Sequence, residues 1–194
     1  MKWILRCGAV LTALLTSVSW AGPREDVNAS IDKFLAARSF HAEMTMSGPR
    51  PMSHQLDFVA PGRYRMRMPG MGEQYIIGDT MFLSIAGKSG PGKTLKVPMP
   101  KGTLSQWRDP ARLAENAAGM SVSALGEESV GGAHAKKYRV VHTKPQPSVM
   151  TLWVGRDGYP LQIITSGNAQ GKSVTTTIRY SRFNDPTIRV DPPK

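Results

Sequence analysis

The chain has 194 residues, with 25 lysines and arginines against 14 aspartates and glutamates, so its formal net charge is +11. A single cysteine excludes an intrachain disulfide and the cysteine-rich zinc motifs. No apolar run after residue 21 approaches the roughly 20 residues that a membrane-spanning helix needs.

Residues 1–21 have the pattern of a secretory signal. Lys2 and Arg6 provide a positive start, an apolar run follows, and Ser19 and Ala21 are the small residues that precede a cleavage site. We therefore expect export to the periplasm with cleavage after Ala21.

The export prediction changes what the basic charge indicates. In a cytosolic protein, such an excess would suggest nucleic acid as a partner. An exported protein does not normally meet nucleic acid, so we expect none. Anionic lipid head groups, acidic partner proteins or solubility alone remain as explanations of the charge.

The predicted elements begin with an amphipathic helix over 24–39, where Val27, Ile31 and Phe34 recur at helical spacing behind an acidic first turn. From residue 40 the period changes to two, which is typical of strands with one buried face. These segments predict strands at 40–46, 56–58, 63–68, 75–77, 81–85 and 95–99.

The second half starts with a predicted helix over 109–119, which Asp109 would cap and Pro110 would open. Strands are then predicted at 123–129, 136–143, 149–154, 161–165 and 173–180. Because nearly all connections have hairpin length, the fold class is α+β: a strongly curved antiparallel sheet, an incomplete barrel, with helices covering its concave face. Residues 22–194 have the size of a single domain.

Residues 87–94, GKSGPGKT, match the phosphate-binding loop pattern literally. That loop works by opening a helix whose amides face the phosphates. Here Pro98 and Pro100 would break such a helix, and the alternation from Leu95 predicts a strand instead. We interpret the segment as a hairpin loop and expect no nucleotide site.

The sequence offers no recognisable catalytic or metal-binding motif. The histidines at 41, 54, 134 and 142 show no close pairing, and the G-x-S-x-G pattern of hydrolases does not occur. We therefore expect no catalytic residue, no metal and no cofactor, and a protein that is not an enzyme.

Methionine is unusually frequent, with 11 in the chain, and several alternate with polar residues in the predicted strands. Three interpretations stay open: ordinary core packing, a flexible lining for a cavity that accepts apolar ligands, and a thioether site for monovalent copper. Met44, Met46, Met66 and Met68 share predicted faces with aromatic residues, which favours an apolar wall over copper.

A basic stripe is predicted on the other side of that wall. Arg63, Arg65 and Arg67 alternate with the apolar residues of their strand. The stripe is either a solvated outer face or a docking surface for an acidic partner or a lipid surface.

The C-terminal third carries a family resemblance. Residues 151–193 contain a Trp strand around Trp153, then D-G-Y-P-L, two strands, the segment Y-S-R-F-N-D-P and a closing V-D-P-P. This order resembles the LolA-like superfamily of exported lipoprotein and lipid carriers, including the LppX/LprG branch. The resemblance implies an incomplete curved barrel with helices as a lid over an apolar cavity, and it implies carriage or sensing of acylated molecules. No counterpart of the arginine that latches the LolA lid is found.

The resemblance and the apolar pattern together predict a monomeric carrier for lipid or lipoprotein acyl chains. The alternative is an envelope-stress regulatory module of the RseB type, with an envelope membrane protein as partner. The candidate lipid-binding residues are Phe40, Met44, Met46, Leu56, Phe58, Tyr64, Met66, Met68, Ile77, Met81, Leu83 and Trp153. The candidate partner-binding residues are Arg63, Arg65 and Arg67.

Overall fold

The computed structural model describes residues 22–70, 72–85, 93–101, 109, 111, 119–143, 147–169 and 171–193. The expected signal at residues 1–21 lies outside these ranges. In the described part of the chain, one helix is followed by eleven strands. None of the helical segments described is long and apolar enough to cross a membrane.

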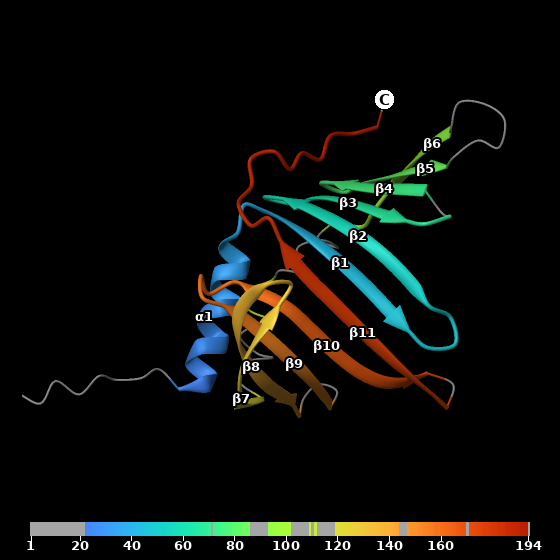
Figure 1. The fold of residues 1–194 in the computed structure, drawn as a ribbon. Coiled ribbons are helices and arrows are strands. Elements are labelled where there is room, and N and C mark those ends of the chain that lie inside the picture. Colours follow the sequence, from blue (N-terminus) through green and yellow to red (C-terminus); the bar gives the residue numbers. More distant parts are fainter. Residues whose placement is uncertain are drawn as a thin grey trace, which may run out of the picture.

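All eleven strands belong to one antiparallel sheet in the order β6-β5-β4-β3-β2-β1-β11-β10-β9-β8-β7. The strands are β1 (Ser39–Ser47), β2 (Met52–Val59), β3 (Arg63–Met68), β4 (Gly72–Ile77), β5 (Thr80–Ile85), β6 (Lys93–Pro98), β7 (Met120–Val130), β8 (Ala133–His142), β9 (Ser148–Gly155), β10 (Pro160–Ala169) and β11 (Lys172–Ser181). Strands β6 and β7 form the two edges, so the sheet does not close into a barrel. Figure 1 shows that the strand direction turns progressively from one edge to the other.

The sheet consists of two meanders that meet at its centre. Strands β1 to β6 follow one another as antiparallel neighbours, and so do β7 to β11. The pairing of β1 with β11, from His41 opposite Ser181 to Ser47 opposite Thr175, joins the two halves. The expected antiparallel meander is therefore confirmed.

Helix α1 (Pro23–Ala36) begins with Pro23 and carries Glu25 and Asp26 in its first turn, where they complement the helix dipole. The sequence predicted that it would continue to Ser39, and the structure corrects this. Ala37 is already extended, and Ser39 opens β1. Tertiary contacts, described next, hold the backbone out of the helix at this point.

The C-terminal segment after β11 fixes the junction between α1 and β1. The backbone N–H of Arg38 donates to Oδ1 of Asn184 at 2.7 Å, and the N–H of Asn184 donates to the carbonyl oxygen of Ser39 at 2.8 Å. Asn184 Nδ2 also donates to the Tyr159 hydroxyl at 2.7 Å. The φ of Asn184 is +57°, in the left-handed region that asparagine tolerates better than most residues. The segment Y-S-R-F-N-D-P thus has a structural role.

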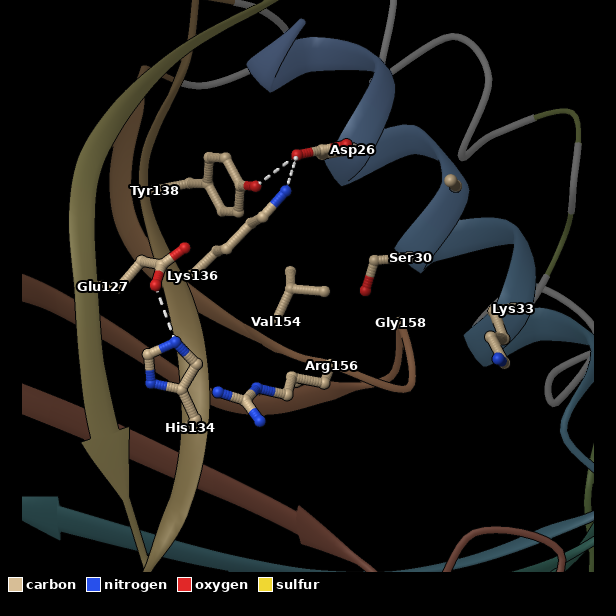
Figure 2. A pocket seen from close by; sticks show the side chains of 12 residues that line it. Asp26, Ser30, Lys33, Glu127, His134, Lys136, Tyr138, Val154, Arg156 and Gly158 are labelled. Carbon is tan, nitrogen blue, oxygen red and sulfur yellow. Dashed lines mark hydrogen bonds and ion pairs between the residues drawn. The ribbon is translucent and has the colours of Figure 1, made fainter. Parts of the chain in front are cut away.

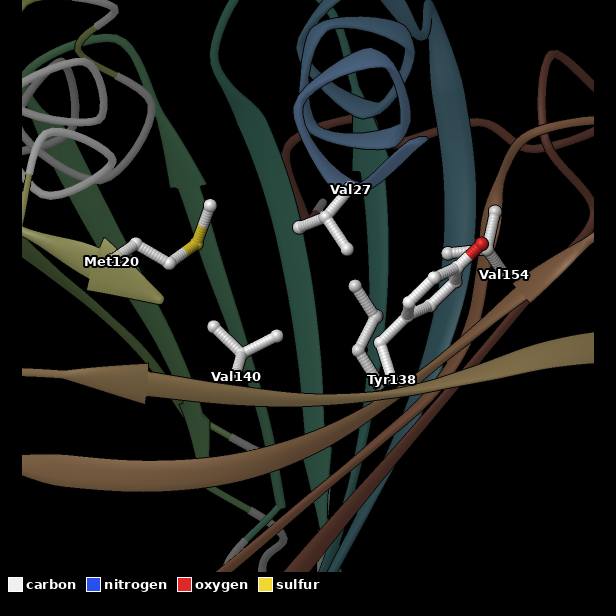
Figure 3. Close-up of a cluster of buried hydrophobic side chains, with 6 residues drawn as sticks. Val27, Met120, Tyr138, Val140 and Val154 are labelled. Carbon is white, nitrogen blue, oxygen red and sulfur yellow. The ribbon is translucent and has the colours of Figure 1, made fainter. Parts of the chain in front are cut away.

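Most of the buried apolar side chains form two clusters on one face of the sheet. The first lies under α1 and contains Val27, Met120, Tyr138, Val140, Leu152 and Val154. Figure 3 shows Val27 pointing from the helix toward Tyr138 and Val140. The second contains Ala37, Phe40, Ala42, Phe58, Tyr64 and Ile76. The helix therefore covers the part of this face formed by β7 to β10.

Of the predicted second helix, only residues 109, 111 and 119 are described. Oδ1 of Asp109 accepts a hydrogen bond from the backbone N–H of Ala111 at 2.9 Å, as expected of a capping residue. Residues 110 and 112–118 lie outside the described ranges. Coverage of the concave face by two helices stays a prediction.

Candidate functional site

The predicted apolar wall exists as one face of the sheet. Phe40, Phe58, Tyr64, Ile76 and Met81 are successive cross-strand partners from β1 to β5. Directly paired residues in antiparallel strands point to the same face, so the register places these side chains together. The same registers put the following predicted residues on this face: Phe40, Met44, Met46, Leu56, Phe58, Tyr64, Met66, Met68, Met81 and Leu83.

The aromatic members of this face belong to the core. Phe40, Phe58 and Tyr64 are buried, and their ring centroids lie 5.0 Å apart from Phe40 to Phe58 and 5.1 Å apart from Phe58 to Tyr64. Phe34 of α1 and Phe183 of the C-terminal segment pack against the same rings. These aromatics stabilise the junction of helix, sheet and C-terminal segment.

The aliphatic members are only half-buried. They form what we call the methionine strip, which runs over β1 to β5 and consists of Met44, Met46, Leu56, Met66, Met68, Met81 and Leu83. Flexible, polarizable methionine side chains on a partly open surface can adapt to apolar ligands of varied shape. The strip is the part of the predicted wall that remains accessible.

Two predicted wall residues lie on the opposite face. Ile77 pairs with Arg63 and Thr80, and its neighbour Ile76 takes the place on the apolar face. Trp153 pairs with Lys137 and Gln162. Both sit in runs of consecutive apolar residues, where alternation cannot tell which residue points inward.

Trp153 is buried by polar neighbours on that opposite face. Its indole N–H donates to Oε1 of Glu128 at 2.6 Å, and the Lys137 ammonium lies 5.0 Å from the ring centroid. Leu152, the preceding residue, packs in the cluster beneath α1 instead. Trp153 therefore does not line the apolar wall.

The predicted arginine stripe lies on the opposite face, as expected, but each arginine has an acidic partner, in the sheet for Arg65 and Arg67 and in the C-terminal segment for Arg63. Arg65 donates to Oδ2 of Asp57 through Nε at 3.1 Å and Nη2 at 2.5 Å. Nε of Arg67 donates to Oε1 of Glu73 at 3.0 Å. Nη1 of Arg63 lies 3.7 Å from Asp191. A partner-binding role for these arginines stays a prediction.

Asp57 is the buried centre of this network. It is only 5% exposed, and its Oδ1 lies 2.7 Å from Nδ1 of His41. Burial opposes the ionised carboxyl, but hydrogen bonds from His41 and Arg65 outweigh it and hold the pKa of Asp57 below its usual value. The carboxylate therefore stays ionised at neutral pH.

A polar pocket of about 660 Å³, here called the helix pocket, opens between α1 and the sheet. Figure 2 shows side chains from α1, β7, β8 and the turn after β9 converging on it. Its lining includes Asp26, Ser30, Lys33, Glu127, His134, Lys136, Tyr138, Val154, Arg156 and Gly158. Sequence reasoning missed this pocket because its residues come from four separate segments without a common motif.

Several polar groups of the helix pocket pair with each other. Oδ2 of Asp26 accepts from the Tyr138 hydroxyl at 2.6 Å and from Nζ of Lys136 at 3.1 Å. The hydrogen bond from Tyr138, supported by Lys136, lowers the pKa of Asp26. Nε2 of His134 lies 2.6 Å from Oε2 of Glu127. These pairs tie α1 to β8 and β8 to β7.

A second pocket of about 370 Å³ lies at the far end of the β1–β2 hairpin. Its lining includes Met46 of the methionine strip together with Met52, Thr175 and Thr177. The register places most of its other lining residues, among them Thr45, Ser53 and Thr177, on the face opposite to the methionine strip, so this pocket is not part of the apolar wall.

The phosphate-loop match ends in a strand. Lys93 and Thr94 begin β6, which pairs with β5, so the helix that a phosphate-binding loop must open is replaced by a strand, as predicted. Residues 86–92 lie outside the described ranges. Among the residues that the structure describes, no group of three or more His, Cys, Asp or Glu could hold a metal ion.

Comparison with known proteins establishes the fold. No known protein family matches the sequence, and neither does any curated protein. Among solved structures, the lipoprotein LppX of Mycobacterium tuberculosis matches with a TM-score of 0.64 at 15% identity, over 87% of this chain and 97% of LppX. LprF from Mycobacterium bovis matches with a TM-score of 0.58 at 12% identity, over 86% of this chain and 95% of LprF. The chain has the fold of LppX and LprF.

A third match extends beyond this chain. MucB matches with a TM-score of 0.50 at 15% identity, over 87% of this chain but only 60% of MucB. At these identities the likeness concerns the fold alone. What the protein binds has to be argued from its own methionine strip and pockets.

Proposed function

We propose that this protein is a periplasmic carrier or binding protein for the acyl chains of lipids or lipoproteins, and not an enzyme. The observation that carries the proposal is the methionine strip, a half-buried apolar surface on one face of a LolA-like sheet. Each methylene group sheltered from water there contributes about 0.8 kcal/mol, so part of one acyl chain suffices for binding. The family resemblance of the C-terminal third supports the same function.

A charge placed on the methionine strip tests this proposal. We expect Met44→Lys to weaken binding of a fluorescent acyl probe at least tenfold, because an acyl chain bound on the strip would cover the ammonium and remove it from water without a partner. Met44→Leu keeps the surface apolar and should bind like the wild type. Thr45→Lys is the matched control. Thr45 is exposed and follows Met44 in β1, so its side chain points to the face opposite to the methionine strip.

Circular dichroism and thermal unfolding establish that each variant is folded. Native mass spectrometry of protein purified from the periplasm should find co-purified lipid in the wild type and less in Met44→Lys. An empty wild-type protein that also takes up no acyl probe would contradict the carrier function.

The alternative is a regulatory module of the RseB type. The fold likeness to MucB favours it, while the difference in length limits the comparison, since this chain spans 60% of MucB. Cross-linking in cells that captures one envelope membrane protein in stoichiometric amounts, without co-purified lipid, would favour the regulatory module over the carrier.

A further inference from the structure

The helix pocket contains cations that the protein itself does not neutralise. Of its three cationic side chains, Lys136 is paired with Asp26. Lys33 donates to a neutral group, the carbonyl oxygen of Asp157, and its ammonium lies 4.7 Å from the Tyr159 ring centroid. Arg156 is exposed and makes no hydrogen bond or ion pair with any residue that the structure describes. Two positive charges of the pocket therefore have no carboxylate partner in the described chain.

The carboxylates of the pocket are already engaged. Asp26 is held by Tyr138 and Lys136, and Glu127 is held by His134. Each of these bonds uses one oxygen of its carboxylate, and neither carboxylate is paired with Arg156. An anion that enters the pocket would therefore meet an Arg156 guanidinium without a carboxylate partner, and carboxylates whose charge is partly offset by their partners.

A buried hydroxyl without a partner lies on the helix side of the pocket. Ser30 is 2% exposed, and its Oγ has no hydrogen-bond partner. A serine within a helix ordinarily bonds to a preceding carbonyl or to water, and a buried hydroxyl without a partner costs about 1 to 3 kcal/mol. Figure 2 shows this hydroxyl pointing from α1 into the space between the helix and the strands. It is a donor available to a ligand oxygen.

The turn after β9, which carries Arg156, lies against α1. Gly158 has a φ of +78°, in the left-handed region that favours glycine, so the turn itself requires this residue. The hydrogen bond from Lys33 to the carbonyl oxygen of Asp157 holds the turn that carries Arg156 beside the helix that carries Ser30.

We propose that the helix pocket binds an anionic oxygen group, a phosphate or a carboxylate, with the Arg156 guanidinium and the Ser30 hydroxyl as donors and Lys33 as an additional charge. The group is either a free anion or the head group of a lipid. The apolar floor formed by Val154 and the Tyr138 ring, which are shared with the cluster beneath α1, suits a ligand that is apolar on one side of its charge.

Titration calorimetry with two probes tests the site in the full exported protein. The probes are inorganic phosphate and short-chain dihexanoyl phosphatidic acid, with uncharged dihexanoylglycerol as the reference. Binding of both phosphorylated probes supports a site for the anionic group itself, and binding of the phosphatidic acid alone supports a head-group site. If neither phosphorylated probe shows saturable binding, the proposal is overturned.

Three variants assign the binding to the named residues. Arg156→Gln should weaken binding at least tenfold, about 1.4 kcal/mol, because a charge-assisted hydrogen bond is lost. Arg50→Gln removes the same charge from an exposed position in the β1–β2 connection and should leave affinity unchanged. Equal affinities of these two variants would overturn the proposal.

Ser30→Ala separates a binding role from a structural one. Removal of a buried, unpaired hydroxyl should leave the melting temperature unchanged or raise it, whereas a binding donor lost at the same position should weaken phosphate binding several-fold. Unchanged affinity in a folded Ser30→Ala protein would rule out this hydroxyl as a donor. Binding of a neutral acyl probe is measured in parallel, so failure of the anion site and failure of the carrier function are distinguishable.

Discussion

At the residue scale, Asp57 determines the character of the arginine-bearing face. One buried carboxylate accepts hydrogen bonds from Arg65 and lies within bonding distance of His41, and Arg67 Nη2 is 3.6 Å away. The arginine stripe, which is basic in the sequence, is therefore part of a network in which carboxylates offset the positive charges. The large net charge of the chain does not imply a strong positive field on this face.

Loss of the Asp57 charge should destabilise the fold in a pH-dependent way. The folded-state pKa lies below the ordinary value, so the ionised carboxyl stabilises the protein at neutral pH. This contribution begins to fall at about pH 4, where the unfolded carboxyl titrates, and is lost as the pH passes through the lower folded-state pKa. We expect Asp57→Asn to lower the free energy of unfolding by about 2 kcal/mol at pH 7 and by much less at pH 3. Denaturant unfolding at both pH values measures this.

The control for Asp57→Asn is Asp32→Asn, at an exposed position of α1. It should change the free energy of unfolding little at either pH. A deficit in Asp57→Asn as large at pH 3 as at pH 7 would attribute the loss to packing instead of charge.

At the element scale, α1 is tied to the sheet at both ends. Near its start Asp26 bonds to Tyr138 and Lys136 of β8, and Val27 is buried against the same strand. Beyond its end, Asn184 of the C-terminal segment holds the extended residues that lead into β1. The helix is thus a fixed boundary of the helix pocket.

Asn184 should be the most sensitive position of the C-terminal segment. Asn184→Ala removes the side-chain hydrogen bonds to Arg38 and Tyr159. It also puts alanine, which tolerates a positive φ less well than asparagine, in the left-handed conformation. We expect a loss of about 2 kcal/mol. Asn184→Gly tolerates the backbone conformation, and Asn184→Asp keeps the acceptor for Arg38. The melting temperature should fall in the order wild type, Asn184→Asp, Asn184→Gly, Asn184→Ala. A glycine variant as stable as the wild type would show that only the backbone conformation matters, and not the side-chain hydrogen bonds.

At the scale of the whole molecule, sequence reasoning succeeded wherever local alternation decided the outcome. It predicted the strands, the hairpins and the shared face of Phe40, Met44 and Met66. It failed on Ile77 and Trp153, because in a run of consecutive apolar residues the sequence does not show which side chains point to the apolar face. Sequence reasoning did not predict the carboxylate partners of the arginines, the β1–β11 pairing or the helix pocket. Each of these depends on contacts with a neighbouring strand or with segments that are distant in sequence.

The open sheet should show a gradient of stability from its centre to its edges. Strands β1 and β11 pair on both sides and join the two meanders, whereas β6 is an edge strand whose six residues are all exposed. Local opening costs least where burial and pairing are least. We therefore expect amide hydrogen exchange to be slowest in β1 and β11 and faster by orders of magnitude in β6. Equal protection of β6 and β1 would indicate that another chain or another segment covers the β6 edge. Dilution would then distinguish the two, because protection by a second copy falls with concentration and protection by a segment of the same chain does not.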